Sequence, residues 1–188
     1  MPTNVPLIYL VIAFAPLLGA VLVGLFGTGF LGRPIGRFMA HRITIALVSL
    51  SAICSIYVLY DVVQGNTFDG TLYVWSMVGS VVFEIGFLID PLSALMMTVV
   101  TLVSLMVHIY SIGYMSEDEG YERFFSYLSL FTFSMLMLVM ANNMLQLFFG
   151  WEAVGLVSYL LIGFYYTRPT AVFANLKAFL INRVGDFG

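Results

Sequence analysis

Six long apolar runs constrain this chain more than any other feature of its sequence. Each run approaches the roughly 20 residues that an α-helix needs to cross a hydrocarbon core of about 30 Å. The runs are Leu7 to Phe26, Arg42 to Val63, Leu92 to Tyr114, Phe124 to Ala141, Met144 to Tyr166, and Thr170 to the chain end. They predict an all-α polytopic membrane protein with about six transmembrane helices.

The composition agrees with a membrane protein and excludes several other classes. Hydrophobic residues make up 61% of the chain and charged residues only 9%, whereas soluble domains contain about 45 to 50% apolar and about 25% charged residues. The net charge of −3 leaves no basic surface for nucleic acid. The single Cys54 allows neither an intrachain disulfide nor a multi-cysteine metal site. No phosphate-binding loop or nucleophile motif of a soluble enzyme is present.

The segment between the second and third runs predicts a short β-hairpin. Two β-prone stretches, 71–78 and 81–89, flank Gly79-Ser80, a pair that suits a two-residue type II′ turn. Asp90 and Pro91 follow as the expected N-cap and first residue of the third helix. The apolar face of the hairpin predicts a contact either with a neighbouring subunit or with the ends of this chain's own helices.

The positions of the arginines predict the orientation in the membrane, because Lys and Arg accumulate in short connections on the inner side. With the N-terminus outside, all the arginines of the connections lie inside. These residues are Arg33, Arg37, Arg42, Arg123 and Arg168. The sequence therefore predicts that the N-terminus and the hairpin face outside.

Glu152 is the most informative single residue, because it places a carboxylate near the middle of the run Met144 to Tyr166. An ionisable group at such a depth costs roughly 2.5 to 3.5 kcal/mol on insertion scales and typically marks an ion or proton pathway. An unpaired charge would be neutralised there, so we expect Glu152 to pair with a lysine. An ion pair that only fastens helices together is the structural alternative.

The last apolar run carries three more charged residues that helical periodicity separates into two groups. At 3.6 residues per turn, Arg183 lies beside the face that holds Asp186, which predicts an ion pair between them. Lys177 precedes Asp186 by nine residues and points the opposite way, toward a different neighbour. Proton transfer is the favoured role for Glu152 and these residues, and a structural role for the Arg183 and Asp186 pair stays open.

The two histidines do not form a suitable pair of haem ligands. His41 is expected at a helix start and His108 near the inner end of the third run. A structural hydrogen-bonding role is predicted for His108, with a proton relay as the alternative.

Several motifs of the second half resemble one known family. The segment Gly150 to Phe164, then Lys177 to Phe179 and Asn182 to Asp186, is similar to the antiporter-like membrane subunits of respiratory complex I. The similarity is greatest to the group called subunit L in bacteria and subunit 5 in mitochondria. Asp90 to Ser93 and Tyr110 to Met115 fit the same group.

The resemblance implies a proton-translocating membrane-arm subunit of NADH:quinone oxidoreductase. It assigns proton transfer to Glu152 and Lys177, and channel tuning or subunit contact to Arg183 and Asp186. It implies no cofactor in this chain, since NADH, FMN, iron–sulfur clusters and quinone belong to other subunits. The expected partners are the other membrane-arm subunits, the lipid bilayer and protons, but no nucleic acid.

The resemblance also implies a location, a division of the chain and two alternatives. The expected location is the bacterial inner (plasma) membrane or the mitochondrial inner membrane. Residues 1–122 would hold three N-terminal helices with the hairpin at about 71–89, and residues 123–188 the first three helices of the antiporter-like repeat, truncated. Family members have many more helices, so we expect a fragment that is inactive alone. A subunit of a multisubunit sodium/proton antiporter and a purely structural subunit remain the alternatives.

Overall fold

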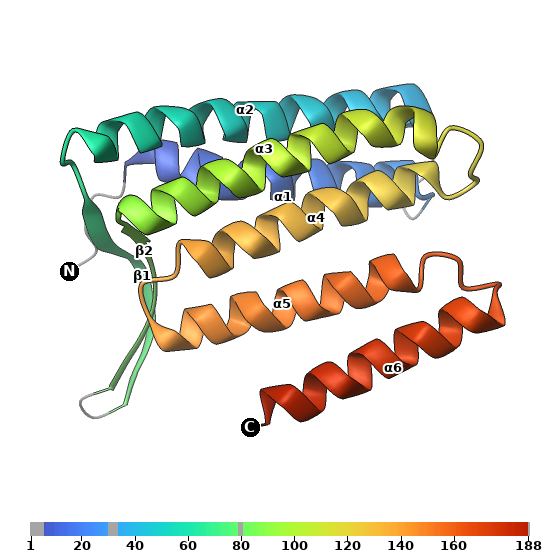
Figure 1. The fold of residues 1–188 in the computed structure, drawn as a ribbon. Coiled ribbons are helices and arrows are strands. Elements are labelled where there is room, and N and C mark those ends of the chain that lie inside the picture. Colours follow the sequence, from blue (N-terminus) through green and yellow to red (C-terminus); the bar gives the residue numbers. More distant parts are fainter. Residues whose placement is uncertain (1–5, 30–33, 79–80, 188) are drawn as a thin grey trace.

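The computed structural model describes residues 6–29, 34–78 and 81–187, without the side chains of Val78 and Val81. Its described residues form six helices and one antiparallel two-stranded sheet (Figure 1). The elements are α1 (Leu7–Gly27), α2 (Arg37–Val63), β1 (Phe68–Val78), β2 (Val81–Ile89), α3 (Pro91–Tyr114), α4 (Tyr121–Val139), α5 (Met144–Ile162) and α6 (Pro169–Asp186). The predicted fold class is therefore confirmed.

The six helices differ in how well they suit a membrane span. Among the described residues, the first five helices are long and apolar enough to cross a bilayer. The sixth, α6, has 18 residues and carries Lys177, Arg183 and Asp186. The sequence analysis counted α6 as a sixth span. Its charges lower its hydropathy, so a place in the membrane requires neighbours for them.

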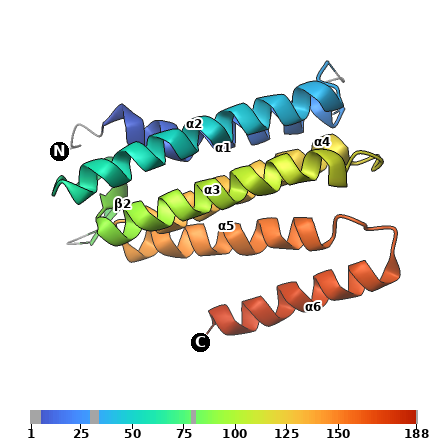
Figure 2. The ribbon, with the colours of Figure 1, turned by 45° about the horizontal axis from the view of Figure 1, so that its top comes forward.

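The helices run alternately up and down (Figures 1 and 2). Helix α4 packs against α1, α2, α3 and α5, whereas α6 lies beside α5 at the edge of the helix set. The N-terminus, the hairpin and the α4–α5 connection lie at one end, and the other three helix connections lie at the opposite end. The α1–α4 bundle is therefore the packed part of the chain, and α5 and α6 extend from it.

The arginines of the connections lie together at one end of the helices, as the sequence analysis expected. Arg37 begins α2 and donates hydrogen bonds to the Ser116 and Asp118 carbonyls, at 2.8 and 2.9 Å. Arg123 lies in the first turn of α4, and Arg168 is the N-cap of α6. Arg33 lies outside the described residues. The starts of α2, α4 and α6, where these residues lie, are at the end of the helices opposite the hairpin (Figure 1).

The hairpin pairs in the predicted way, but its first strand starts three residues earlier than expected. Strand β1 has 11 residues and β2 has nine, and the register shifts between Thr71 and Tyr73 and between Val74 and Ser76. These irregularities let the longer strand pair with the shorter one, because a bulge sets two residues against one. The predicted turn at Gly79-Ser80 lies outside the described residues.

Strand β2 is fastened to the α4–α5 connection. The Leu88 amide donates to the Met140 carbonyl at 3.0 Å, and the Gly86 amide donates to Oε1 of Gln146 at 2.9 Å. A Cβ at Gly86 would lie 2.2 Å from Nδ2 of Asn142 and 2.6 Å from the Gly70 carbonyl oxygen, and the backbone atom cannot turn away as a side chain can, so the position requires glycine. The base of the hairpin therefore rests on this chain's own helix ends, which is one of the two expected neighbours.

The outer part of the hairpin has a different environment from its base. Phe87 and Ile89 are fully buried among the helices, whereas Tyr73, Trp75 and Met77 are exposed. In Figure 1 the hairpin runs across the ends of the helices and past the start of α5. Contact with a neighbouring subunit remains a prediction for this exposed part.

Helix α3 begins as the sequence predicted. The Ser93 amide donates to Oδ1 of Asp90 at 2.7 Å, and the Asp90 amide donates to the Ser93 hydroxyl at 2.8 Å, with Pro91 as the first helical residue. Such a capping box satisfies amides that the helix itself leaves unpaired. The hydrogen bond from the Ser93 amide holds the pKa of Asp90 below its usual value.

Gly150 sets the distance between α4 and α5. A Cβ at this position would lie 2.8 Å from both Cα and N of Leu138 in α4. Backbone atoms cannot rotate away as a flexible side chain can, so Gly150→Ala should push the helices apart at a cost of roughly 1 to 3 kcal/mol. We expect a lower melting temperature and a lower content of the full-length subunit in purified membranes.

Gly113→Ala is a matched control for this change, since among the described residues nothing beyond the adjoining backbone of α3 lies within 4 Å of a Cβ at that position. The control should leave both quantities close to those of the parent. Equal melting temperatures for the Gly150 and Gly113 variants would contradict the assigned role of Gly150.

Candidate charged site between α5 and α6

Glu152 and Arg183 form an ion pair that joins α5 to α6. Nη1 of Arg183 contacts Oε2 of Glu152, and Nη2 of the same guanidinium lies 3.2 Å from Oδ2 of Asp186. One cation is thus shared between two carboxylates, which the forked donor geometry of arginine permits. The predicted Arg183 and Asp186 pair is present.

The expectation that Glu152 pairs with a lysine is wrong for the described residues. Lys177 is exposed and makes no hydrogen bond or ion pair with any residue that the structure describes. It lies on a different side of α6 from Arg183 because six residues correspond to about one and two-thirds turns. The sequence analysis predicted this separate direction of Lys177 but did not consider Arg183 as the partner of Glu152.

A glycine makes room for the guanidinium on α5. A Cβ at Gly155 would lie 2.9 Å from Nη2 of Arg183. The structure shows a side chain of α6 in this space, which is how Arg183 reaches across to α5.

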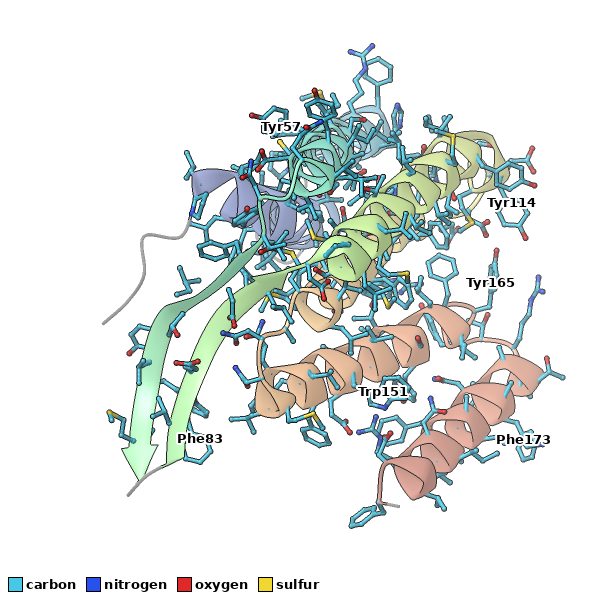
Figure 3. The ribbon with its side chains drawn as sticks, turned by 60° about the vertical axis from the view of Figure 1, so that its left-hand side comes forward. Tyr57, Phe83, Tyr114, Trp151, Tyr165 and Phe173 are labelled. Carbon is cyan, nitrogen blue, oxygen red and sulfur yellow. The ribbon has the colours of Figure 1, made fainter. Side chains whose placement is uncertain are left out.

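Trp151 completes the cluster. Its Nε1 donates a hydrogen bond of 2.7 Å to Oδ1 of Asp186. Figure 3 shows Trp151 on α5 in the region that faces α6. The sequence analysis quoted this residue only as part of a motif. The sequence feature that could have identified Trp151 is an indole N–H within an apolar run. Such a donor has no water to bond there and needs an acceptor in the protein.

Aromatic side chains support the cation from α6 and α5. Cζ of Arg183 lies 5.2 Å from the centre of the Phe179 ring, which in turn makes an edge contact with Tyr159 at 5.2 Å between ring centres. A guanidinium near a ring face is attracted by the ring's negative quadrupole. These contacts restrict the positions that Arg183 can take.

The charged cluster is accessible from one side. The exposed fractions of the side chains are 28% for Arg183, 25% for Glu152 and 12% for Asp186. A cavity of about 560 Å³ borders the cluster and is also lined by Ser158 and Asn182. Asp186 and Arg183 line this cavity, whereas Glu152 is not among its lining residues, so water in the cavity would reach the cluster at Asp186 and Arg183.

Lys177 belongs to the outer face of α6. It shares this exposed face with Phe173, which projects away from α5 in Figure 3. Leu180 and Val184 are exposed on the same helix. A cation on an otherwise apolar helix face needs a partner when the helix lies in a membrane. Lys177 is therefore positioned to contact a group outside the Glu152 cluster.

The histidines lie away from this site. His108 is fully buried in α3, and its Nδ1 lies 2.8 Å from the Ser104 carbonyl, as expected for a hydrogen-bonding residue. Nδ1 of His41 lies 3.1 Å from the Tyr121 hydroxyl. His41 lies in the second turn of α2, which begins four residues earlier, at Arg37. Within the described residues, no group of three or more His, Cys, Asp or Glu side chains could hold a metal ion.

Two family sequence models match consecutive parts of the chain. Residues 75–125 match the family described as NADH-ubiquinone oxidoreductase (complex I), chain 5 N-terminus. Residues 141–188 match the family described as NADH:quinone oxidoreductase/Mrp antiporter, TM, and these residues include the whole charged cluster.

Curated relatives from bacteria and eukaryotes are similar over nearly the whole chain. The NADH-quinone oxidoreductase subunit L of Neisseria meningitidis serogroup B is 61% identical over 184 residues, which is 96% of this chain and 27% of that protein. The NADH-ubiquinone oxidoreductase chain 5 of Arabidopsis thaliana is 50% identical, and that of Dictyostelium discoideum 46%; each match covers 96% of this chain and 26% of the relative. The chain therefore spans about a quarter of the length of these relatives.

A solved structure has the same fold at much lower sequence identity. A chain of the membrane-bound sulfane sulfur reductase, an archaeal respiratory membrane complex, superposes with a TM-score of 0.79 and 15% identity, over 96% of this chain and 35% of that chain. This similarity concerns the fold alone. The two family matches and the identity to subunit L and chain 5 show that the chain belongs to the antiporter-like membrane subunits of complex I.

Proposed function

We propose that this chain is part of a proton-translocating membrane-arm subunit of NADH:quinone oxidoreductase, in which Glu152 takes up and releases a proton. One observation carries the proposal: the carboxylate of Glu152 shares a guanidinium with Asp186, and Arg183 and Asp186 line an accessible cavity. A carboxylate can exchange a proton, whereas the adjacent guanidinium keeps its charge.

Arg183 gives the cluster a way to respond when Glu152 changes charge. Arginine stays protonated in proteins, so its charge is constant. When Glu152 gains a proton, Arg183 keeps Asp186 as its counter-ion. When Glu152 loses the proton, the guanidinium again pairs with both carboxylates, and the cluster then carries one net negative charge. The proton therefore comes and goes at Glu152 without leaving Arg183 unpaired. In this proposal Arg183 and Asp186 tune the channel or its contact with an adjacent subunit.

Lys177 is proposed as a second proton-transfer residue, which acts toward a partner on the outer face of α6. Its ammonium can lose a proton when its surroundings exclude water, which arginine cannot do. The proposed partners are further membrane-arm subunits or helices, and the electron carriers FMN, iron–sulfur clusters and quinone are proposed to reside in other subunits.

The test of Lys177 uses the full-length subunit in its complex. We expect Lys177→Met to lower proton transfer in sealed vesicles more than it lowers subunit content, because the variant removes the titrating group from an exposed position. Lys177→Arg should not restore full transfer, since arginine keeps its proton. Unchanged proton transfer in the Met variant at matched complex content would remove Lys177 from the pathway.

We propose that the N-terminus and the hairpin face outside, in a bacterial inner membrane or a mitochondrial inner membrane. In a background that carries Cys54→Ser, Thr67→Cys should react with an impermeant thiol reagent added from the outside. Glu117→Cys, at the opposite end of the helices, should react only from the inside and is the matched position. Labelling of Thr67→Cys from the inside alone would contradict this topology.

The division of the chain at residue 122 is also a proposal. Residues 1–122 would form the N-terminal helices with the hairpin, and residues 123–188 the start of the antiporter-like repeat. The match of residues 141–188 to the family that includes Mrp antiporters supports the assignment of the second part.

Two other functions each have a supporting observation. The ion pair across α5 and α6 supports a structural subunit whose charges fasten helices. The family description for residues 141–188 supports a subunit of a sodium/proton antiporter. Proton transfer driven by NADH oxidation without a sodium requirement favours the first proposal, whereas sodium-dependent proton exchange without NADH favours the antiporter.

A further inference from the structure

A second charged site lies at the end of the helices opposite the hairpin, apart from the Glu152 cluster. A cavity of about 400 Å³ is present there between the start of α2, the start of α4 and the α5–α6 connection. Its lining residues are Arg37, Glu119, Gly120, Arg123 and Tyr166. Two guanidinium groups therefore border one cavity at the ends of helices that are long enough to span a membrane.

The two arginines of this cavity have no acidic partner. Both ion pairs of the described residues belong to Arg183, and the residues outside the described ranges include no Asp or Glu. Arg37 and Arg123 donate to backbone carbonyl oxygens instead, at 2.8 and 2.9 Å from Arg37 and 3.3 Å from Arg123. A carbonyl accepts a hydrogen bond without neutralising the cation, and a guanidinium has five N–H donors. Each arginine therefore keeps its full charge and has further donors.

Arg123 is held in place and has an unpaired donor. The centres of the Phe164 and Tyr166 rings lie 4.9 and 5.1 Å from its Cζ. Its Nε is buried and has no hydrogen-bond partner among the described residues. Buried polar atoms are almost always paired, so an unpaired donor on a residue that lines a cavity indicates an acceptor in that cavity. A guanidinium that is already fixed loses little entropy when such an acceptor binds.

The cavity is positively charged overall. Glu119 lines it together with the two arginines, so these three side chains sum to one positive charge. Glu119 is exposed, and with Glu122 and Arg123 it also lines a neighbouring cavity of about 140 Å³. Neither glutamate forms an ion pair with Arg123. A phosphodiester, which carries one negative charge, would neutralise the larger cavity.

The start of α4 adds donors at the same place. The helix begins at Tyr121 after Gly120, and no side chain caps its first amides. The N-terminal end of a helix carries a partial positive charge and attracts anions. A Cβ at Gly120 would lie 2.8 Å from Cζ of Phe164 and 3.0 Å from Nη2 of Arg123, so the glycine lets the guanidinium lie close to the helix start.

The surroundings of the cavity favour a lipid phosphate over a soluble anion. Arg37 begins α2, and the next two residues, Phe38 and Met39, have exposed apolar side chains. Tyr166 is also exposed, and tyrosine is enriched where membrane proteins meet the headgroup region. In the orientation proposed above this end faces inside, where anionic lipids accumulate and basic pockets bind their headgroups.

We propose that the phosphodiester of an anionic membrane lipid binds in this cavity between Arg37 and Arg123. Arginine binds phosphate oxygens through short, charge-assisted hydrogen bonds, and the phosphate supplies the acceptor that Nε of Arg123 lacks. The acyl chains lie along Phe38 and Met39 of α2. The site is separate from Glu152 and does not depend on the proposed role in proton transfer.

The site is tested in the full-length complex in nanodiscs of phosphatidylcholine. A phosphatidylglycerol probe with a photoreactive headgroup should label residues 116–123 or 163–168. Unlabelled phosphatidylglycerol should compete for this labelling, whereas inorganic phosphate at the same concentration should not, because it lacks acyl chains. Equal competition by inorganic phosphate would overturn the lipid as the ligand.

Charge variants then separate binding from packing. Arg123→Gln should weaken the competition by phosphatidylglycerol about tenfold, as expected for the loss of charged hydrogen bonds. Arg42→Gln, which removes an arginine of α2 that does not line the cavity, is the control and should change little. Glu119→Gln keeps both arginines and removes a repelling charge, so it should strengthen the competition about twofold to fivefold. Glu117→Gln, in the same connection but outside the cavity, should not.

A density map of the full-length complex shows directly what fills the cavity. We expect a phosphate within hydrogen-bond distance of both guanidinium groups, joined to acyl-chain density along α2. A carboxylate side chain from the rest of the subunit or from a neighbouring subunit in this place would overturn the proposal. Equal weakening by the Arg123 and Arg42 variants, or unchanged competition in the Glu119 variant, would also overturn it.

Discussion

Replacement of Glu152 by Gln is expected to leave the complex assembled while redox-driven proton transfer falls about tenfold or more. Glutamine keeps the volume of the side chain and accepts hydrogen bonds from Arg183, but it cannot exchange a proton in the working pH range. Arg183 retains Asp186 as a counter-ion in this variant, so no cation is left without a partner. A structural role for Glu152 would therefore survive the change far better than a proton-carrying role.

Glu152→Asp is the matched control for this prediction. It keeps the carboxylate but withdraws it from Arg183 by one methylene, and we expect intermediate proton transfer. The measurement is proton transfer in sealed vesicles per NADH oxidised, at matched complex content. Equal transfer in the Gln variant and the parent would remove Glu152 from the proton pathway.

Replacement of Arg183 by Met is expected to act mainly on assembly, that is, on the content of the subunit in the membrane. The change leaves the carboxylates of Glu152 and Asp186 near each other without their shared cation. Removal of one partner from a buried ion pair typically costs about 3 to 5 kcal/mol, and the partial exposure of this cluster reduces that figure. We expect lower subunit content in the membrane and weak proton transfer in the complexes that do form.

A second substitution separates charge from packing at Arg183. Glu152→Gln in the Arg183→Met background removes one unpaired carboxylate, so the double variant should recover much of the subunit content without recovering proton transfer. Arg183→Lys should retain content, since it keeps the charge. Identical content in the single and double variants would show that the guanidinium contributes through packing and not through its charge.

The two outcomes together distinguish the proposed functions. A structural subunit predicts that Glu152→Gln and Arg183→Met both act on assembly. A proton-translocating subunit predicts that the first acts on transfer and the second on assembly. The ion pair alone does not decide between them, because a buried ion pair is weak evidence for stability.

The sequence determined that this chain is an all-α membrane protein, because a membrane-spanning helix depends on residues that are close together in the sequence. A helix that crosses lipid needs a continuous apolar run, and the six runs of this chain became six helices. The N-cap at Asp90 depends on residues that are close in sequence, so the sequence predicts it, and the structure adds the reciprocal hydrogen bond of Ser93. The pair of Arg183 and Asp186 likewise follows from one turn of one helix.

Only the tertiary structure decided what each side chain meets across helices. Helical periodicity gives the direction of Glu152 on α5, but not the rotation and distance at which α6 lies beside it. The partner is Arg183 and not a lysine because Gly155 lets the guanidinium approach α5. The hydrogen bond from Trp151 to Asp186 joins residues 35 apart in sequence and depends on the same packing. Such contacts arise from the fit of two surfaces, which no spacing within a single helix specifies.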